Sequence, residues 1–181
     1  MSLSVMVDLE TLGTKANAPI MQIGAVVFDD ETGIVYRDRV FECKVLLNSE
    51  IENIDPETLK WWLTKDPALM RHVLAGEPRI TLLSALDAFG AWLADQNAKT
   101  IWADSPSFDV AILRNSFARF NLRFPMSFRQ ERCFRTIKNL ATEVGLKSAP
   151  NLNPHDALCD AIYQAECAVV ILKRLKQPAV A

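Results

Sequence analysis

The sequence has few of the features that mark a secreted or membrane protein. Only four of its 181 residues are cysteines, and none of them form a CxxC pair or another metal-ligand spacing: Cys43, Cys133, Cys159 and Cys167. No run approaches the ~18 apolar residues of a membrane span, and residues 1–7 lack the basic and apolar regions of an export signal. We therefore expect reduced thiols, no membrane association and a cytoplasmic location.

Internal repeats and low-complexity tracts are also missing. Hydrophobic residues make up 50% of the chain and charged residues 23%, which is close to ordinary globular usage. A chain of this length suits one domain with a buried core. We predict a single domain over residues 1–181, with the last few residues forming a disordered tail.

The chain has no excess of positive charge, since its net charge is −2. This argues against sequence-blind electrostatic adhesion to nucleic acid. The charge is unevenly spread, because residues 114–138 hold seven basic residues and one acid; this segment carries +6, which leaves −8 for the rest. We call its basic residues the basic strip: Arg114, Arg119, Arg123, Arg129, Arg132, Arg135 and Lys138. Such a strip suits a phosphate backbone, although a solvated surface would have the same composition.

Most strands are predicted from short apolar runs. Residues 3–9 and 20–28 are rich in Val, Ile and Met, as in strands buried on both faces of a sheet. The turn "DDETG" at 29–33 and the alternating run at 34–46 predict a hairpin to a third strand. A further short strand is expected at 99–103.

Helix signals separate these strands. Asp55-Pro56-Glu57 combines an N-cap, a proline and a first-turn acid, and Asp66-Pro67 repeats the signal. Trp61 and Trp62 in the first of these helices are adjacent, so we expect one in the core and the other as a stacking platform or partner contact. Apolar spacing predicts further helices at 80–96, 108–120, 136–144 and 157–176. The order of elements indicates a mixed α/β domain with helices covering a sheet.

Asp8 and Glu10 place two carboxylates at the end of the first apolar strand. Residues two apart on a strand point to the same face. Burial of two like charges raises their pKa values and costs stability unless a cation lies between them, and a divalent metal is the economical candidate. The spacing alone is weak, because Asp29 and Glu31 form a second D-x-E that we interpret as a solvated turn.

Three further residues strengthen the metal-site hypothesis. Asp109 in "SFDVAIL" stands in the first turn of a predicted helix, where an acid can also simply complement the helix dipole. His155 and Asp160 in "PHDALCDA" stand at the start of the last helix. Five steps of ~100° would put them on different helix faces, so we expect His155 in the preceding loop, over the same cleft as Asp160. A lone histidine is more often a structural hydrogen-bonding group than a catalyst, so the combination carries the hypothesis.

In this order the motifs resemble those of the DEDDh branch of the 3′-to-5′ exonucleases. The matching stretches are D-x-E-T at 8–11, S-F-D at 107–109 and H-x-A-L-x-D at 155–160. "APIMQIGAVVFD" resembles the second strand of that superfamily, while "WWL" and "RTI" resemble phage and prophage exonucleases of the exonuclease VIII type. Asp104 and Asp156 depart from the pattern, since relatives commonly carry Asn at both positions. The resemblance covers nearly the whole chain.

The resemblance implies a fold and a chemistry. The fold would be similar to ribonuclease H, with a mixed five-stranded sheet flanked by helices. The four carboxylates of Asp8, Glu10, Asp109 and Asp160 would bind two divalent cations, Mg²⁺ or Mn²⁺, and His155 would take a proton from the attacking water as general base. The substrate would be single-stranded nucleic acid with a free 3′ end. It would be hydrolysed stepwise, and the products would be 5′-nucleoside monophosphates.

The resemblance also implies substrate contacts and leaves alternatives open. The stretch Glu10-Thr11-Leu12 would hold the terminal nucleotide and its 3′-hydroxyl. Phe108 would either stack on a base or pack in the core. DNA is favoured over RNA by the likeness to phage exonucleases. An exoribonuclease, a nuclease subunit or binding module of a larger replication or recombination complex, and a homodimer remain alternatives.

Overall fold

Strands from distant parts of the chain form the framework of the protein. The computed structural model describes residues 2–47, 51–143, 145–146, 150–151 and 153–176. Within them lie six strands: β1 (Leu3–Thr11), β2 (Ile20–Asp29), β3 (Ile34–Val45), β4 (Arg79–Ile80), β5 (Thr100–Ala103) and β6 (Glu131–Cys133). They form one sheet in the order β4-β3-β2-β1-β5-β6. The β1–β2 and β2–β3 pairs are antiparallel and the other three pairs are parallel, so the sheet is mixed.

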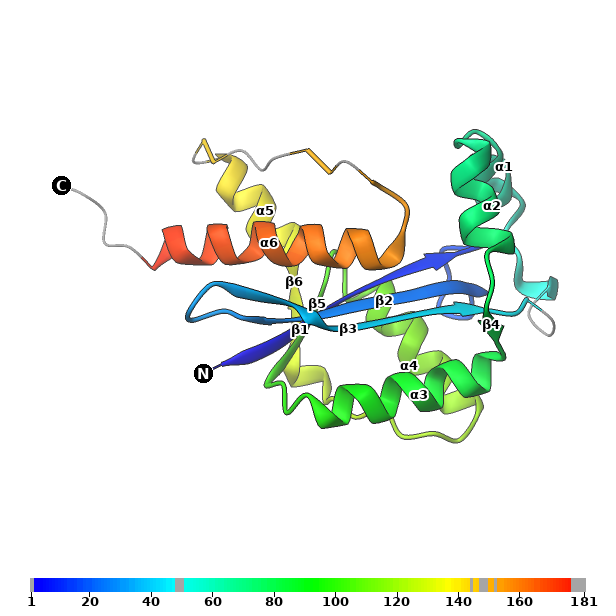
Figure 1. The fold of residues 1–181 in the computed structure, drawn as a ribbon, viewed down its shortest axis with the longest axis horizontal. Helices are drawn as coiled ribbons and strands as arrows, with labels where there is room; N and C mark the ends of the chain where they lie inside the picture. Colours follow the sequence, from blue (N-terminus) through cyan, green and yellow to red (C-terminus); the bar gives the residue numbers. More distant parts are fainter. Residues whose placement is uncertain (1, 48–50, 144, 147–149, 152, 177–181) are drawn as a thin grey trace.

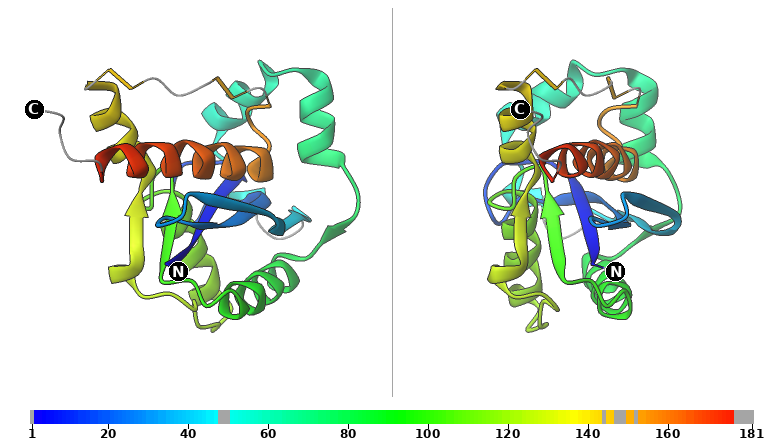
Figure 2. Two further views of the ribbon diagram at one scale, coloured as in Figure 1. Left: turned by 60° about the vertical axis from the view of Figure 1, so that its left-hand side comes forward. Right: turned by 90° about the vertical axis from the view of Figure 1, so that its left-hand side faces the viewer.

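Helices connect and cover these strands. Those of the described residues are α1 (Pro56–Leu63), α2 (Pro67–Ala75), α3 (Leu82–Asp95), α4 (Asp109–Arg119), α5 (Phe134–Glu143) and α6 (Ala157–Leu175). Figures 1 and 2 show α5 and α6 on one face of the sheet, α3 and α4 on the other, and α1 and α2 at one end. As far as the description extends, none of these helices has both the length and the apolar character needed to cross a membrane.

The predicted mixed α/β architecture is confirmed. The sheet has six strands where five were expected, and the two-residue β4 lies at its edge beside β3. The sequence pattern did not indicate β6, because Glu-Arg-Cys has no apolar alternation. The helix predicted from residue 136 begins at Phe134, whereas its predicted end at Val144 and the predicted tail lie outside the described residues.

Side-chain alternation along β1 explains how both faces are covered. Val5, Val7 and Leu9 pack in the cluster formed with α3 and α4, whereas Met6 packs in the cluster formed with α5 and α6. Asp8 and Glu10 continue the row of Met6, because side chains two apart share a face. The two carboxylates therefore point toward the side of the sheet that α6 covers.

A third cluster fixes α1 and α2 at the end of the central strands. It consists of Leu12, Met21, Trp62 and Val73, which are all buried. Asp55 and Asp66 cap the two helices by accepting backbone N–H groups, as predicted. The helix pair is thereby held beside the end of β1.

Candidate active site

Asp8 and Glu10 lie at the end of β1, on the central strand of the sheet. Asp8 is opposite Gly24 and Glu10 is opposite Gln22 on β2, and the register shifts between Glu10 and Thr11. An irregularity of this kind bends a strand and redirects its side chains, and it is frequent next to active sites. Glu10 is 7% exposed, so its carboxylate lies in a largely water-excluded place.

Asp109 reaches the same place from α4. It is the first residue of that helix and follows β5, which runs parallel to β1. Its Oδ1 accepts the backbone N–H of Leu9 at 3.2 Å, and the side chain is only 3% exposed. Asp109 is thus a buried acid that is hydrogen-bonded to β1 between Asp8 and Glu10. Complementing the helix dipole does not by itself account for this position.

Asp160 arrives from the opposite side because α6 begins directly on β2. A Cβ on Gly24 would lie 2.2 Å from the Ala157 carbonyl carbon and from the Leu158 nitrogen, so the helix rests on bare backbone. Glycine is required at such an approach. Because Gly24 pairs with Asp8, this contact places the first turn of α6, with Asp160, over the carboxylates of β1.

His155 lies in the segment before α6, as predicted. Its φ is +69°, a left-handed conformation that is uncommon for non-glycine residues and often marks functional sites. The His155 N–H donates to Asp160 Oδ2 at 2.8 Å, and Asn151 donates to the other oxygen of that carboxylate. One possible ligand atom each from Glu10, His155 and Asp160 lies within 4.8 Å of the other two.

The electrostatics of this cluster are unfavourable for a set of carboxylates alone. Burial, followed by the charges of Asp160, Asp156 and Asp109, raises the pKa of Glu10 from 4.5 to about 9. Burial and the neighbouring acids also raise the pKa of Asp8 well above its ordinary value, and burial raises the pKa of Asp109 to about 7. Divalent cations bound among these oxygen ligands would relieve the repulsion, so the donor set fits Mg²⁺ or Mn²⁺.

Burial also favours the neutral form of His155, and for an imidazole this lowers the pKa. Burial, and then the nearby Lys65 ammonium, lower the pKa of His155 below its ordinary value of 6.5. The imidazole is therefore neutral at pH 7 and able to accept a proton. Its ring packs edge-on against Trp61, with the centroids 4.9 Å apart.

Gln164 is a site residue that the sequence reasoning missed. It donates to Asp8 Oδ1 at 2.7 Å and is 7% exposed, and its own Oε1 has no partner among the described residues. It stands one helical turn after Asp160, so both face β1. That spacing was the available signal, whereas nothing in the sequence pointed to Asn151 beside Asp160.

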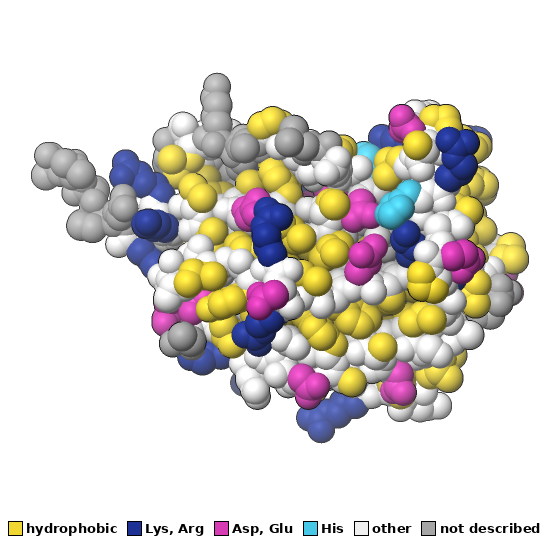
Figure 3. Space-filling model, in the orientation of Figure 1, with side chains coloured by type: hydrophobic (Ala, Val, Ile, Leu, Met, Phe, Trp, Pro, Cys, Tyr) yellow, Lys and Arg dark blue, Asp and Glu magenta, His cyan; other side chains and the backbone are white. Residues whose placement is uncertain are grey.

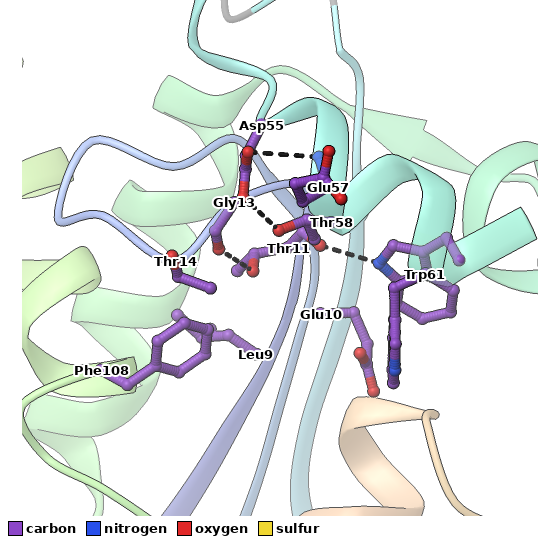
Figure 4. A pocket seen from close by; sticks show the side chains of 11 residues that line it. Leu9, Glu10, Thr11, Gly13, Thr14, Asp55, Glu57, Thr58, Trp61 and Phe108 are labelled. Carbon is purple, nitrogen blue, oxygen red and sulfur yellow. Dashed lines mark hydrogen bonds between the residues drawn. The ribbon is translucent and has the colours of Figure 1, made fainter.

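A cavity of about 470 Å³ opens beside Glu10. Figure 4 shows Phe108 and Trp61 on opposite sides of it, with Glu10 between them. Thr11 lines the cavity and donates from Oγ1 to the Gly13 carbonyl at 2.7 Å. Phe108 also packs against the core cluster, which is one of its two predicted roles, and its stacking on a base stays a prediction.

Leu12 does not join Thr11 and Phe108 in the cavity. Its side chain is 2% exposed and packs with Trp62 under α1. Its N–H donates to the Pro19 carbonyl and its own carbonyl accepts the Asp55 N–H, so its backbone is occupied as well. In this structure Leu12 supports the loop that carries Thr11, and its predicted contact with a nucleotide stays a prediction.

Trp61 and Trp62 separate as expected. Trp62 is 1% exposed and donates from Nε1 to the Thr11 carbonyl at 2.9 Å. Trp61 is 41% exposed, lines the cavity and carries the Lys65 ammonium 3.9 Å from its ring centroid. Its two predicted roles, a stacking platform or a partner contact, both stay predictions.

The extra acid Asp104 and part of the basic strip neutralise each other. Arg135 donates to Asp104 Oδ2 from Nε at 2.9 Å and from Nη2 at 2.5 Å. Arg114 pairs with Glu131 at 2.7 Å. The strip is therefore partly engaged in internal ion pairs, and its predicted contact with a phosphate backbone stays a prediction.

Comparisons with known proteins identify a family and a fold. A family model described as the 3'-5' exoribonuclease Rv2179c-like domain matches residues 3–172. Comparison with curated proteins gives no match. Similar solved structures include three nucleases, which share 14–18% identity with this chain and whose likeness therefore shows a common fold.

The three structures differ in length. Cell-death related nuclease 4 (CRN-4) is 18% identical with a TM-score of 0.66, and the match covers 97% of this chain and 64% of that one. The nuclease domain of 3'hExo, a DEDDh family member bound to rAMP, is 14% identical with a TM-score of 0.65, covering 96% and 92%. The zinc-bound E. coli ExoI–ssDNA complex is 18% identical with a TM-score of 0.67, covering 98% and 42%. The chain thus spans less than two thirds of CRN-4 and ExoI.

Proposed function

This chain belongs to the family of the 3'-5' exoribonuclease Rv2179c-like domain, and from that premise we propose that it is a metal-dependent 3′-to-5′ exonuclease of single-stranded nucleic acid. The observation that carries the proposal is the convergence of three further acids and a neutral histidine around Glu10, which lines the cavity. They come from β1, α4, the segment before α6, and α6. The products would be 5′-nucleoside monophosphates.

The four carboxylates are the groups that would hold the cations. They are Asp8, Glu10, Asp109 and Asp160. Two divalent ions, Mg²⁺ or Mn²⁺, would neutralise the phosphodiester and make a water molecule a better nucleophile. Gln164 would keep the Asp8 carboxylate oriented, and the Leu9 N–H would do the same for Asp109.

His155 would act as the general base. It is neutral at pH 7 and projects toward the carboxylates from a loop that Asp160 and Trp61 hold in place. A neutral imidazole within reach of the attacking water can take its proton as the phosphate is attacked. His155 is thus proposed as a catalytic residue rather than as a structural hydrogen-bonding group.

The cavity would receive the 3′-terminal nucleotide. Its volume of about 470 Å³ lies within the ~300–1,000 Å³ range of small-ligand sites. Trp61 and Phe108 offer aromatic faces for a base, and Thr11 lines the side next to Glu10. These three residues are our candidates for substrate binding.

The choice between DNA and RNA is a separate part of the proposal. The sequence favoured DNA through its likeness to phage exonucleases of the exonuclease VIII type, and this stays a prediction. The description of the matched family favours RNA, so an exoribonuclease is the second candidate. The structurally similar ExoI is described in complex with ssDNA and 3'hExo with rAMP, which is consistent with either.

Organisation beyond the site also stays at the level of prediction. A single domain and a cytoplasmic location are the sequence-based expectations, while a homodimer and participation in a larger replication or recombination complex are alternatives. The packing of Trp61 against His155 makes this ring less available for a remote partner. We therefore favour an enzyme that acts on the strand without an assembly partner at that surface.

One assay tests the proposed activity. Purified protein is incubated with 5′-labelled single-stranded DNA and RNA of equal sequence, with Mg²⁺, Mn²⁺ or chelator. A ladder that shortens from the 3′ end, loss of cleavage in chelator, and loss in Asp8→Ala and His155→Ala with the fold retained are expected. Full activity in chelator would overturn the metal mechanism. The relative cleavage rates of the DNA and RNA substrates show which of the two the enzyme prefers.

A further inference from the structure

Asp156, next to His155, connects three elements by hydrogen bonds. Its Oδ1 accepts the Cys159 N–H at 3.0 Å and thereby caps α6. Its Oδ2 accepts from Gln22 Nε2 of β2 at 3.1 Å and lies 2.9 Å from His72 Nε2 of α2. The Asp156 side chain is only 13% exposed, so these partners replace most of its water.

Gln22 attaches this part of the chain to the sheet. Its side chain is fully buried, its Oε1 accepts the Ala157 N–H at 3.2 Å, and its Nε2 donates to both Asp156 and Glu42. Gln22 is also the cross-strand neighbour of Glu10. The two residues after His155 are therefore fixed relative to the carboxylates of β1.

His72 extends the network to α2, which packs beside α1, the helix that lines the cavity. Its Nδ1 lies 3.4 Å from Lys44 Nζ, and an ammonium can only donate. Nε2 is then the nitrogen that carries the proton, and it donates to Asp156 Oδ2. Figure 3 shows a histidine among acidic and basic side chains on the face where α2 meets the start of α6.

The same histidine and two acids, Glu42 and Asp156, also bring potential metal-ligand atoms within 4.8 Å of one another. The Lys44 ammonium beside His72 opposes a cation there, and the Gln22 amide already donates to both carboxylates. A hydrogen-bond network that links β2, α2 and the start of α6 explains these contacts better than a second metal site.

His155 is thus held on both sides. Its own N–H is bonded to Asp160, and the next residue is anchored to β2 and α2. The left-handed backbone between these anchors needs such support, because this conformation is unfavourable for a side-chain-bearing residue. We propose that Asp156, held by Gln22 and His72, is a positioning residue that keeps the His155 imidazole aimed at the reacting water, an inference that rests on the proposed function.

Asp156→Asn is the most selective change. Asn keeps the size of the side chain and the oxygen that caps α6. It places an NH₂ group where Oδ2 now accepts from Gln22 and His72, so donors would face donors. The variant therefore keeps the cap of α6 and changes only the position of Oδ2, which contacts Gln22 and His72.

The kinetic arm compares Asp156→Asn in the wild-type and His155→Ala backgrounds. In the wild type we expect kcat to fall about tenfold while KM changes less than about twofold. In His155→Ala, whose residual rate is measured with excess enzyme, we expect the same change to cost less than about twofold, because a residue that acts through His155 has nothing left to position. An equal loss in both backgrounds, or an unchanged kcat in the wild type, would overturn the proposal.

A second variant guards against misfolding. His72 is half exposed, so His72→Ala should fold, and we expect a smaller fall in kcat that is not additive with Asp156→Asn. Arg71→Ala, one residue earlier on the exposed side of α2, is the matched control and should leave kcat unchanged. A loss shared by both variants of α2 would contradict the tie through His72.

Hydrogen exchange of the metal-free protein tests the geometry without activity. The His155 N–H should exchange faster in Asp156→Asn and in His72→Ala, while amides in the middle of α6 keep their protection. Unchanged exchange at His155 would overturn the proposal. Inactive wild-type protein would instead defeat the proposed function, and the exchange result would still decide whether the network holds this residue.

Discussion

Replacing Glu10 with glutamine should stabilise the metal-free protein while removing its function. The pKa of Glu10 is raised from 4.5 to about 9, chiefly by burial and then by neighbouring acids. Between these two values the folded protein keeps a proton that the unfolded chain releases. The free energy of unfolding therefore falls as the pH rises through this window.

The size of the effect follows from the same values. One pKa unit corresponds to 1.36 kcal/mol, so between pH 4.5 and pH 7 the fold loses on the order of 3 kcal/mol through Glu10. Gln has the same shape and no titration, so Glu10→Gln should recover up to about 3 kcal/mol at pH 7 and flatten the pH dependence. Glu143→Gln, at an exposed site on α5, is the matched control and should stay within about 0.5 kcal/mol of the wild type.

Urea unfolding in chelator at pH 5 and pH 7 measures these differences. Added Mg²⁺ or Mn²⁺ should stabilise the wild type and do much less for Glu10→Gln, because the cation binds the folded state through the missing carboxylate. A variant that is less stable than the wild type at pH 7 in chelator would refute the view that unfavourably buried acids await a cation.

Three other changes address α6, the cavity and the base. Gly24→Ala would place a Cβ 2.2 Å from the backbone at the start of α6, so we expect a loss of about 1–3 kcal/mol in urea unfolding together with reduced kcat, and unchanged values would contradict the packing. Trp61→Ala should lower kcat/KM by the ~1–3 kcal/mol of one stacked base and have little effect on stability. Trp62→Ala should instead cost about 3–5 kcal/mol of folding free energy. Equal effects of the two variants on kcat/KM and on stability would refute the separation of their roles. Lys65→Gln removes a charge that lowers the pKa of His155, so the acidic limb of the pH–kcat profile should move to higher pH, and a limb that stays in place would argue against His155 as the base.

Local signals in the sequence predicted much of the framework. Asp55 and Asp66 cap their helices because proline and N-cap chemistry act over a few residues. Asp8 and Glu10 share a face because strand geometry has a period of two. His155 lies before α6 because five helical steps could not bring it beside Asp160.

Other features depend on contacts between distant residues and left little local trace. Gln22, a polar residue inside an apolar strand, bonds to Asp156 across 134 positions, and Gln164 bonds to Asp8 across 156. Such partners are set by where α6 crosses β1 and β2, which periodicity does not encode. The burial of Leu12 also left no local trace, because a sequence neighbour of Thr11 can face the core while Thr11 faces the cavity.

The central claim is that acids from β1, α4 and α6 together hold divalent cations. Anomalous diffraction from crystals grown with Mn²⁺ would locate the bound ions directly. We predict strong peaks among the carboxylates of Asp8, Glu10, Asp109 and Asp160, and loss of these peaks in Asp8→Asn. Mn²⁺ found only elsewhere, for example at the Glu42, His72 and Asp156 cluster, would contradict the claim.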